Sequence, residues 1–339
     1  MSDNIVTVTP TEFLGFLEEH FKTKRPMFVR GGPGVGKSSI IKQFCEAKKI
    51  GYVDLRVLYY DPTDLKGMPH LNVKDRTTEW FTPDELPTEG EGCMVLEELN
   101  AAPPLTQAAC YQLLFERQIG EYRLPDGWFI VATGNRLQDK AVVNKIPSPL
   151  VSRFASHVTL DVSVDDWTAY AVQKNLAPEV IAFFRLRREL LNGFDPAKWT
   201  PDTPYCCPRT AEFLAEKVAA CAPNNPSLAQ IASCVGAGTG AEFFGFLDIY
   251  KEVPSLEQIL LDPKGAPVPT KPAALWAVVS GLARKVTKGN VDRVFTYLAR
   301  VPKEFEVCSV RDAMKICKEI TATSAFVKWA SANTAILSS

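Results

Sequence analysis

Eight residues, GGPGVGKS at positions 31–38, constrain this chain most strongly, because they match the pattern G-x-x-x-x-G-K-[ST] in full. A short apolar run at 27–29 precedes them, and a helix is expected over 38–47. Strand, glycine-rich loop and helix in this order form a phosphate-binding loop, where backbone N–H groups and the positive end of the helix face phosphate oxygens. The alternative is a glycine-rich turn without a ligand. The full match favours a protein that binds a nucleoside triphosphate.

Nine consecutive residues are expected to hold the nucleotide. Lys37 would reach the β- and γ-phosphates, and the Ser38 hydroxyl would bind Mg²⁺. The nine residues are Gly31, Gly32, Pro33, Gly34, Val35, Gly36, Lys37, Ser38 and Ser39.

Composition narrows the class of protein. A net charge of −1 over 339 residues gives no overall field for nucleic acid or membranes. The nine cysteines are odd in number and scattered, which indicates reduced thiols rather than a disulfide framework. The first residues lack the basic and apolar regions of a secretory leader, and no run approaches the length of a membrane-spanning helix. We expect a cytoplasmic protein without a membrane span.

Apolar runs alternate with helical patterns through the first half of the chain. The runs are expected to form strands at 27–29, 52–57, 93–96, 128–133 and 157–160. This alternation predicts an α/β P-loop NTPase with a parallel five-stranded sheet and helices on both faces. Residues 61–92 are expected to be a loop with a hairpin around 70–82.

After residue 162 the pattern becomes helical, with Ser163 expected to cap the first helix. Helical periodicity over 176–193, 208–222 and 227–248 follows, and a proline-rich stretch marks a linker. The expected organisation is an α/β nucleotide-binding core (1–162), an all-helical lid (163–250), a proline-rich linker (251–272) and a helical C-terminal extension (273–339).

Polar residues follow two of the expected strands. Glu97 and Glu98 end the apolar run MVLEE, about sixty residues after Lys37, and Asn135 follows the run at 128–133. At the carboxyl ends of parallel strands these side chains would face the phosphate loop. We assign Glu97 to magnesium, Glu98 to the attacking water and Asn135 to that water or the γ-phosphate. The alternatives are a Glu98 that caps a turn and an asparagine that forms one.

These motifs together resemble the AAA+ ATPases, specifically the MoxR-like group (AAA_5 type). The resemblance rests on the phosphate loop, the acidic pair, Thr-Gly-Asn at 133–135, and LVSRF at 150–154. The stretch LNAAPPLTQ after the acidic pair and DPTDLKG at 61–67 are similar to that group as well. The match covers roughly residues 25–250.

The resemblance implies an ATPase that hydrolyses ATP with Mg²⁺ and forms a homo-oligomeric ring, usually a hexamer, with ATP at subunit interfaces. It implies that Asn135 is the sensor-1 residue, Arg153 an arginine finger that acts on the neighbouring subunit, and Arg209 the sensor-2 residue. Taken singly, both arginines would be read as surface salt-bridge residues. Arg117 and Arg136 are weaker interface candidates. The family usually has Asp-Glu where this chain has Glu97-Glu98, so we expect nucleotide binding to survive and hydrolysis to be the step that this difference affects.

Three functions are compatible with the sequence. The first is ATP-driven remodelling or activation of a protein partner, which the resemblance suggests is von Willebrand A-like. The insertion at 61–92, including Trp80 and Phe81, and the hairpin-like 118–128 would then line the ring pore or its rim, although the two aromatics could instead anchor the hairpin on the core. The second is a nucleic-acid-acting motor, suggested by basic residues between 284 and 300. The third is a slow nucleotide-dependent assembly switch, suggested by Glu97.

Overall fold

The computed structural model describes residues 5–139, 143–251 and 253–333. Within it the chain forms two compact units, Met1–Val162 and Ser163–Ser339. Residues 1–4, which carry part of the expectation that no secretory leader is present, lie outside the described ranges.

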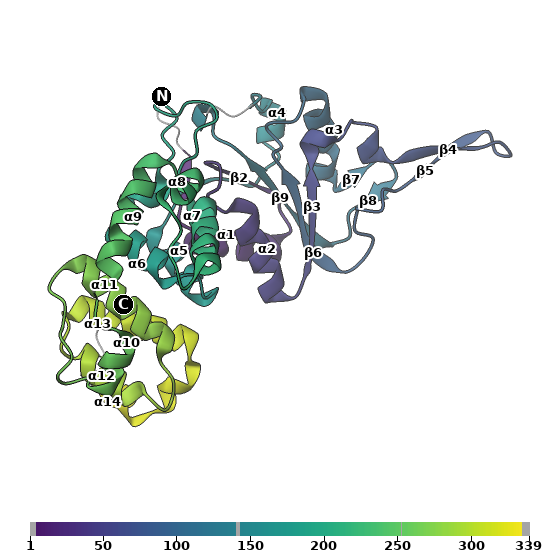
Figure 1. The fold of residues 1–339 in the computed structure, drawn as a ribbon. Coiled ribbons are helices and arrows are strands. Elements are labelled where there is room, and N and C mark those ends of the chain that lie inside the picture. The colour runs from purple at the N-terminus through teal and green to yellow at the C-terminus, as the bar shows by residue number, and fades with distance from the viewer. Residues whose placement is uncertain (1–4, 140–142, 252, 334–339) are drawn as a thin grey trace. The chain divides into compact units, whose positions relative to one another are not determined.

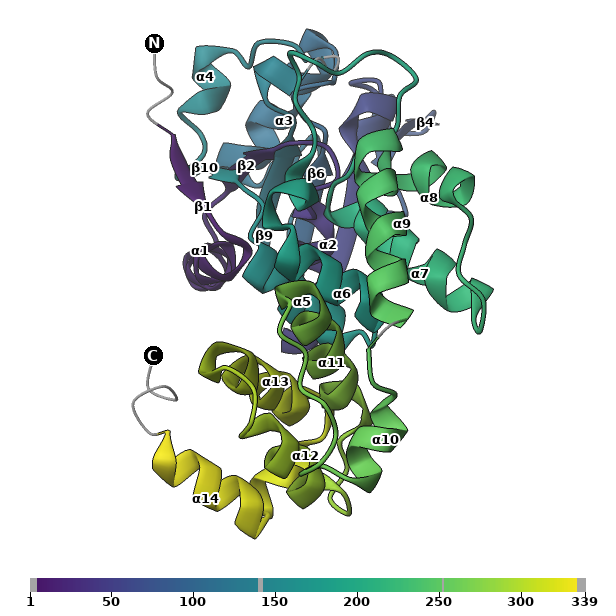
Figure 2. The same ribbon diagram turned by 60° about the vertical axis from the view of Figure 1, so that its left-hand side comes forward.

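The first unit is built on a parallel sheet of six strands in the order β1-β10-β2-β9-β6-β3 (Figure 1). The strands are β1 (Val6–Val8), β2 (Met27–Gly31), β3 (Gly51–Arg56), β6 (Glu91–Glu97), β9 (Gly127–Gly134) and β10 (Ser156–Leu160). The parallel sheet is confirmed, but the count of five strands is wrong by one. The additional strand β1 lies beside β10 at the sheet edge (Figure 2). Its three residues are too few to show an alternating pattern.

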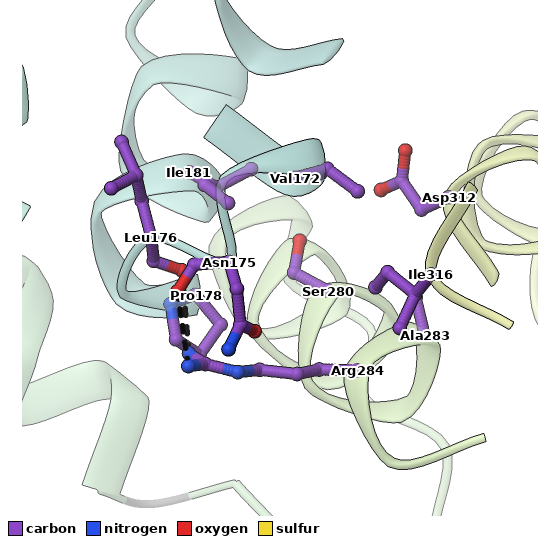
Figure 3. A pocket seen from close by; sticks show the side chains of 10 residues that line it. All are labelled: Val172, Asn175, Leu176, Pro178, Ile181, Ser280, Ala283, Arg284, Asp312 and Ile316. Atoms are coloured by element: carbon purple, nitrogen blue, oxygen red, sulfur yellow. Dashed lines mark hydrogen bonds between the residues drawn. The ribbon is translucent and has the colours of Figure 1, made fainter. Parts of the chain in front are cut away.

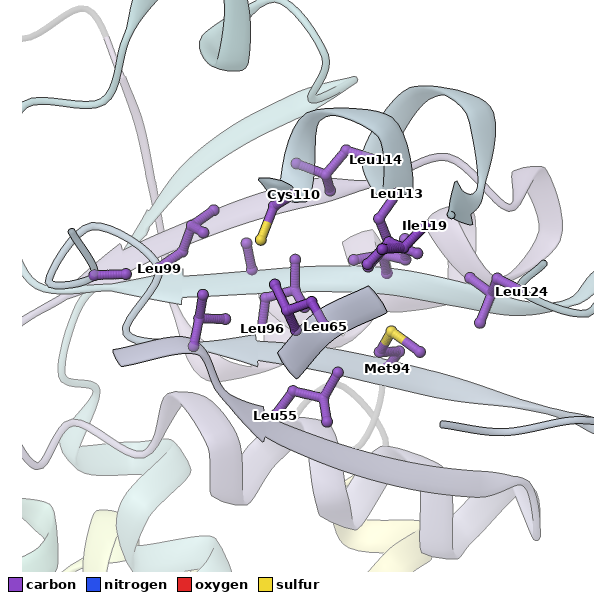
Figure 4. Close-up of a cluster of buried hydrophobic side chains, with 14 of the residues drawn as sticks. Leu55, Leu65, Met94, Leu96, Leu99, Cys110, Leu113, Leu114, Ile119 and Leu124 are labelled. Atoms are coloured by element: carbon purple, nitrogen blue, oxygen red, sulfur yellow. The ribbon is translucent and has the colours of Figure 1, made fainter. Parts of the chain in front are cut away.

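Helices cover both faces of this sheet, as predicted. The helices α1 (Pro10–Thr23) and α2 (Lys37–Lys48) pack on one face, and α3 (Pro104–Glu116) and α4 (Ser148–Val151) on the other. Successive strand residues alternate between the two cores, since side chains of a strand point to opposite faces. In β2, for example, Met27 and Val29 join the core under α1 and α2, whereas Phe28 joins the core under α3. Figure 4 shows part of this second core.

Two small hairpins and three short 3-10 helices complete the first unit. They are β4 (Met68–Asn72) with β5 (Thr77–Phe81), β7 (Gln118–Ile119) with β8 (Tyr122–Arg123), η1 (Val57–Tyr59), η2 (Asp64–Lys66) and η3 (Leu137–Asp139). The β4–β5 ribbon projects from the sheet (Figure 1), so the predicted hairpin is confirmed. Phe81 is 60% exposed with its ring 5.3 Å from that of His70, so it does not anchor the hairpin on the core.

The second unit is all helical. Its helices are α5 (Val164–Gln173), α6 (Pro178–Leu186), η4 (Arg188–Asn192), α7 (Pro208–Cys221), α8 (Leu228–Val235), α9 (Ala237–Lys251), α10 (Leu256–Leu261), α11 (Pro272–Lys285), α12 (Val291–Leu298), α13 (Lys303–Ile316), η5 (Lys318–Ala322) and α14 (Ser324–Ala332). Ser163 caps α5 as predicted. The helix expected over 227–248 is two helices, broken at Gly236, where φ is +86°. Among the helices that the structure describes, none combines the length and apolar character that crossing a bilayer demands.

The stretch 253–272 packs within this unit. It contains α10, and its Ile259 and Ala266 belong to the same buried apolar core as α11–α14. A buried ion pair joins α6 to α13, with Arg185 Nη1 2.6 Å from Asp312 Oδ2. Beside it lies a cavity of about 10 Å³ (Figure 3), which has room for one water and not for a substrate.

Candidate active site

The loop between β2 and α2 has the backbone geometry that phosphate binding requires. Gly34 and Gly36 have φ values of +75° and +99°, a region that L-residues rarely adopt. A Cβ on Gly31 would lie 2.9 Å from the carbonyl oxygen of Leu160, so this position has no room for a side chain either. The loop leads directly into α2, which begins at Lys37, so the positive end of the helix follows the loop.

Lys37 bridges the phosphate loop and the end of β9. Its Nζ donates hydrogen bonds to the carbonyl oxygens of Gly31, at 2.9 Å, and Gly32, at 3.2 Å. It also lies 3.4 Å from Oδ1 of Asn135. The structure therefore brings together two residues that the sequence separates by almost one hundred positions.

Ser38 and Glu97 contact each other directly. The Ser38 hydroxyl donates to Oε1 of Glu97, at the carboxyl end of β6. The other carboxylate oxygen, Oε2, accepts a hydrogen bond from the Thr133 hydroxyl at 2.8 Å. A hydroxyl and a carboxylate in contact are the kind of oxygen ligands that Mg²⁺ takes in nucleotide sites, so these two residues fit the metal.

Glu98 has a strained backbone and an exposed side chain. Its φ is +54°, in the left-handed region that glycine favours. Its N–H donates to the Thr133 hydroxyl at 3.1 Å, and its carbonyl accepts from the N–H of Ala101 at 2.7 Å. These hydrogen bonds stabilise a backbone conformation that is unfavourable for glutamate. Strained backbone of this kind is common at functional sites.

Asn100 is a site residue that was not predicted from the sequence. Its buried side chain forms two hydrogen bonds with the backbone of Asn135: Nδ2 donates to the carbonyl at 2.7 Å, and Oδ1 accepts from the N–H at 3.2 Å. The Asn100 carbonyl accepts from the N–H of Asn144 at 2.7 Å. This pairing fixes the backbone that carries the sensor-1 candidate. The sequence shows an asparagine three positions after Glu97. Only the fold shows that its side chain is buried and binds the backbone of Asn135.

Two carboxylates on neighbouring strands, Asp54 on β3 and Glu97 at the end of β6, repel each other. Desolvation, and then the Glu97 carboxylate, raise the pKa of Asp54, while Arg56 acts in the opposite direction. Burial of the Asp54 carboxylate is the larger cause of this shift in its pKa, and the charge of Glu97 is the smaller one.

Arg117 and Arg136, the weaker interface candidates, both bind groups within the first unit. Arg117 donates to the carbonyls of Pro125 and Trp128, both at 2.7 Å. Arg136 forms an ion pair with the buried Asp139 at 2.9 Å. Its guanidinium lies beside the phosphate loop, because a Cβ on Gly32 would be 3.1 Å from Arg136 Nη2.

The remaining two site candidates are Arg153 in the first unit and Arg209 in the second. Arg153 follows α4, and its guanidinium carbon lies 4.9 Å from the ring centre of Tyr111 and 5.9 Å from that of Phe115, both on α3. Its Nη1 donates to the carbonyl of Pro149. Arg209 is exposed in the first turn of α7, in the second unit.

Comparison with known proteins finds a family match within the first unit. Residues 26–154 match the family model of the AAA domain (dynein-related subfamily). Solved structures with a similar fold include NtrX from Brucella abortus, with 12% identity, a TM-score of 0.42 and coverage of 90% of this chain and 67% of that chain. They also include the Thermotoga maritima RuvB Holliday junction branch migration motor, with 15% identity, a TM-score of 0.38 and 80% of each chain covered. No curated protein matches the chain significantly. The chain has the P-loop fold of the AAA+ ATPases, with a parallel sheet flanked by helices.

Proposed function

We propose that this chain, whose residues 26–154 form an AAA domain of the dynein-related subfamily, is a Mg²⁺-dependent ATPase that assembles into a MoxR-like ring and remodels a protein partner. One observation carries the proposal. At the start of α2, Lys37 contacts Asn135, which follows β9, and Ser38 contacts Glu97, which ends β6 and precedes Glu98. These are the parts that phosphoryl transfer to water requires.

Each residue has a role that follows from its contacts. The loop N–H groups and Lys37 would bind the phosphates, and Ser38 and Glu97 would hold Mg²⁺, which supplies charge stabilisation to phosphate oxygens. Glu98 would polarise the attacking water from its exposed position. Asn135, anchored by Asn100, would orient that water or the γ-phosphate.

The interface roles are also proposals. Arg153 rests on the aromatic rings of Tyr111 and Phe115, both on α3, which suits a residue that acts on the site of a neighbouring subunit. Phe115 is 69% exposed and could be covered in a ring. We propose Arg153 as the arginine finger and Arg209 as the sensor-2 residue.

A protein partner is favoured over nucleic acid. The basic residues of the C-terminal helices gave the nucleic-acid alternative its support, yet several are engaged within the second unit. Arg284 donates to the carbonyls of Asn175 and Leu176 at 3.1 and 3.3 Å (Figure 3), and Arg300 donates to that of Pro263 at 2.8 Å. Guanidinium groups that bind backbone carbonyls hold the fold together and offer fewer donors to phosphates. We place the protein in the cytoplasm, where the nine free cysteines would remain reduced.

The direct contact between Ser38 and Glu97 favours one second candidate, a slow nucleotide-dependent assembly switch. A metal that binds between these two groups must separate them, and a glutamate extends further toward the serine than an aspartate would. Nucleotide binding would then drive assembly while turnover stays slow.

The Glu98→Gln variant separates the two functions. For an ATPase, the wild type converts bound ATP to ADP, whereas the variant binds ATP equally well and retains it unhydrolysed. Bound nucleotide, released by denaturation and separated by chromatography, gives the answer directly. If the wild type also retains intact ATP over many minutes, the switch is correct. If neither protein binds ATP, both proposals are wrong.

A further inference from the structure

Thr133 forms hydrogen bonds with three successive residues, Glu97, Glu98 and Leu99, which we call the acidic turn. Its hydroxyl donates to Oε2 of Glu97 at 2.8 Å and accepts the N–H of Glu98 at 3.1 Å. Its carbonyl oxygen accepts the N–H of Leu99 at 3.0 Å.

The surroundings of Thr133 are those in which an apolar side chain is usually found. Thr133 is fully buried in β9, with Val29 as its register partner on β2. A hydroxyl buried at such a place is unfavourable unless its hydrogen bonds are made. Both the donor and one acceptor site of this hydroxyl are used, and both partners belong to the acidic turn. Valine has nearly the same shape as threonine but lacks the hydroxyl. The two hydrogen bonds that the hydroxyl makes to Glu97 and Glu98 therefore account for a threonine at this position.

We propose that Thr133 is a positioning residue for the acidic pair, an inference that rests on the ATPase function proposed above. By taking Oε2 of Glu97, the hydroxyl leaves Oε1 directed at Ser38 and the metal site. By accepting the Glu98 N–H, it fixes the left-handed backbone from which the Glu98 side chain extends. One side chain thus sets both the metal ligand and the residue that acts on water.

The test compares Thr133→Val, which removes the hydroxyl and keeps the shape, with Thr133→Ser, which keeps the hydroxyl. A fluorescent ATP analogue is titrated with each protein, first in EDTA and then over a range of Mg²⁺ concentrations. In EDTA all three proteins should bind alike, because the phosphate loop and Lys37 are unchanged. With Mg²⁺, Thr133→Val should need about 10–100-fold more metal for the same gain in affinity, the usual effect of losing a partner that orients a metal ligand.

Turnover provides the second readout. We expect kcat of Thr133→Val to fall at saturating Mg²⁺ and ATP, and Thr133→Ser to restore both Mg²⁺ dependence and kcat. A Thr133→Val protein that matches the wild type in Mg²⁺ dependence overturns the inference, and so does a Thr133→Ser protein that is as impaired as the valine variant. If circular dichroism shows that Thr133→Val is unfolded, Thr133→Ala carries the same expectation. A wild type that shows neither Mg²⁺-dependent binding nor hydrolysis overturns the proposed function itself.

Discussion

Replacing Glu98 by glycine should abolish hydrolysis without the loss of stability that a disrupted turn would cause. The φ of +54° places this residue in the left-handed region, which costs an L-residue roughly 1–2 kcal/mol and glycine almost nothing. Ordering glycine in place of alanine costs about 0.4–1 kcal/mol because glycine is freer in the unfolded chain. Taken at the middle of each range, the difference predicts that Glu98→Gly is more stable than Glu98→Ala by about 0.8 kcal/mol.

The comparison with alanine removes the contribution of the carboxylate, since both variants lack it. For a unit of this size the difference corresponds to a Tm higher by about 1–4 °C, which thermal unfolding followed by circular dichroism can resolve. Both variants should lose about 10²–10⁴-fold in kcat, the usual effect of removing a general base. Their affinity for ATP should stay near that of the wild type.

Two results would refute this reasoning. If Glu98→Gly is less stable than Glu98→Ala by more than 1 kcal/mol, the backbone at this position is not strained in the way its φ indicates. If Glu98→Gly hydrolyses ATP within a few-fold of the wild type, Glu98 is a turn residue and not the group that acts on water.

Three further predictions follow from the site. Lys37→Ala should abolish ATP binding, measured by titration with a fluorescent analogue; an affinity within about tenfold of the wild type would contradict the phosphate-loop assignment. Arg153→Ala should bind ATP and lose hydrolysis, and mixing it with Glu98→Gln in one ring should restore some activity, because the finger of one subunit would serve the site of another; confirmed mixed rings without activity would count against this division of roles. Asn100→Leu should lower the free energy of unfolding by about 2–4 kcal/mol, because two backbone groups of Asn135 lose their partners, and a loss below about 1 kcal/mol in urea would show that the pairing matters little.

Motifs with a local physical cause were predicted well from sequence. The glycine-rich loop, the helix that follows it and the strands that end at Glu97 and Gly134 each depend on glycine conformation or apolar periodicity within a few residues. Failures occurred where a neighbour far along the chain decides the structure. The edge strand β1 exists because β10 lies beside it, and Gly236 ends α8 where a Cβ would be 2.6 Å from the carbonyl oxygen of Pro204.

The same limit applies within the site. Spacing and residue type were enough to propose Glu97, Glu98 and Asn135 as neighbours of the phosphate loop. The sequence could not show that Asn100 and Thr133 hold them, because asparagine and threonine are common residues and their partners lie about 35 positions away. Sequence therefore suggested which groups could act, and the structure shows what keeps them in place.

Steady-state ATPase activity with Mg²⁺, measured together with mass photometry in the presence and absence of ATP, tests the central claim most directly. We predict Mg²⁺-dependent turnover and a particle that grows to a ring, six subunits in the expected case, when ATP is added. Absence of both turnover and nucleotide-dependent assembly, in a protein shown to be folded, would contradict the account.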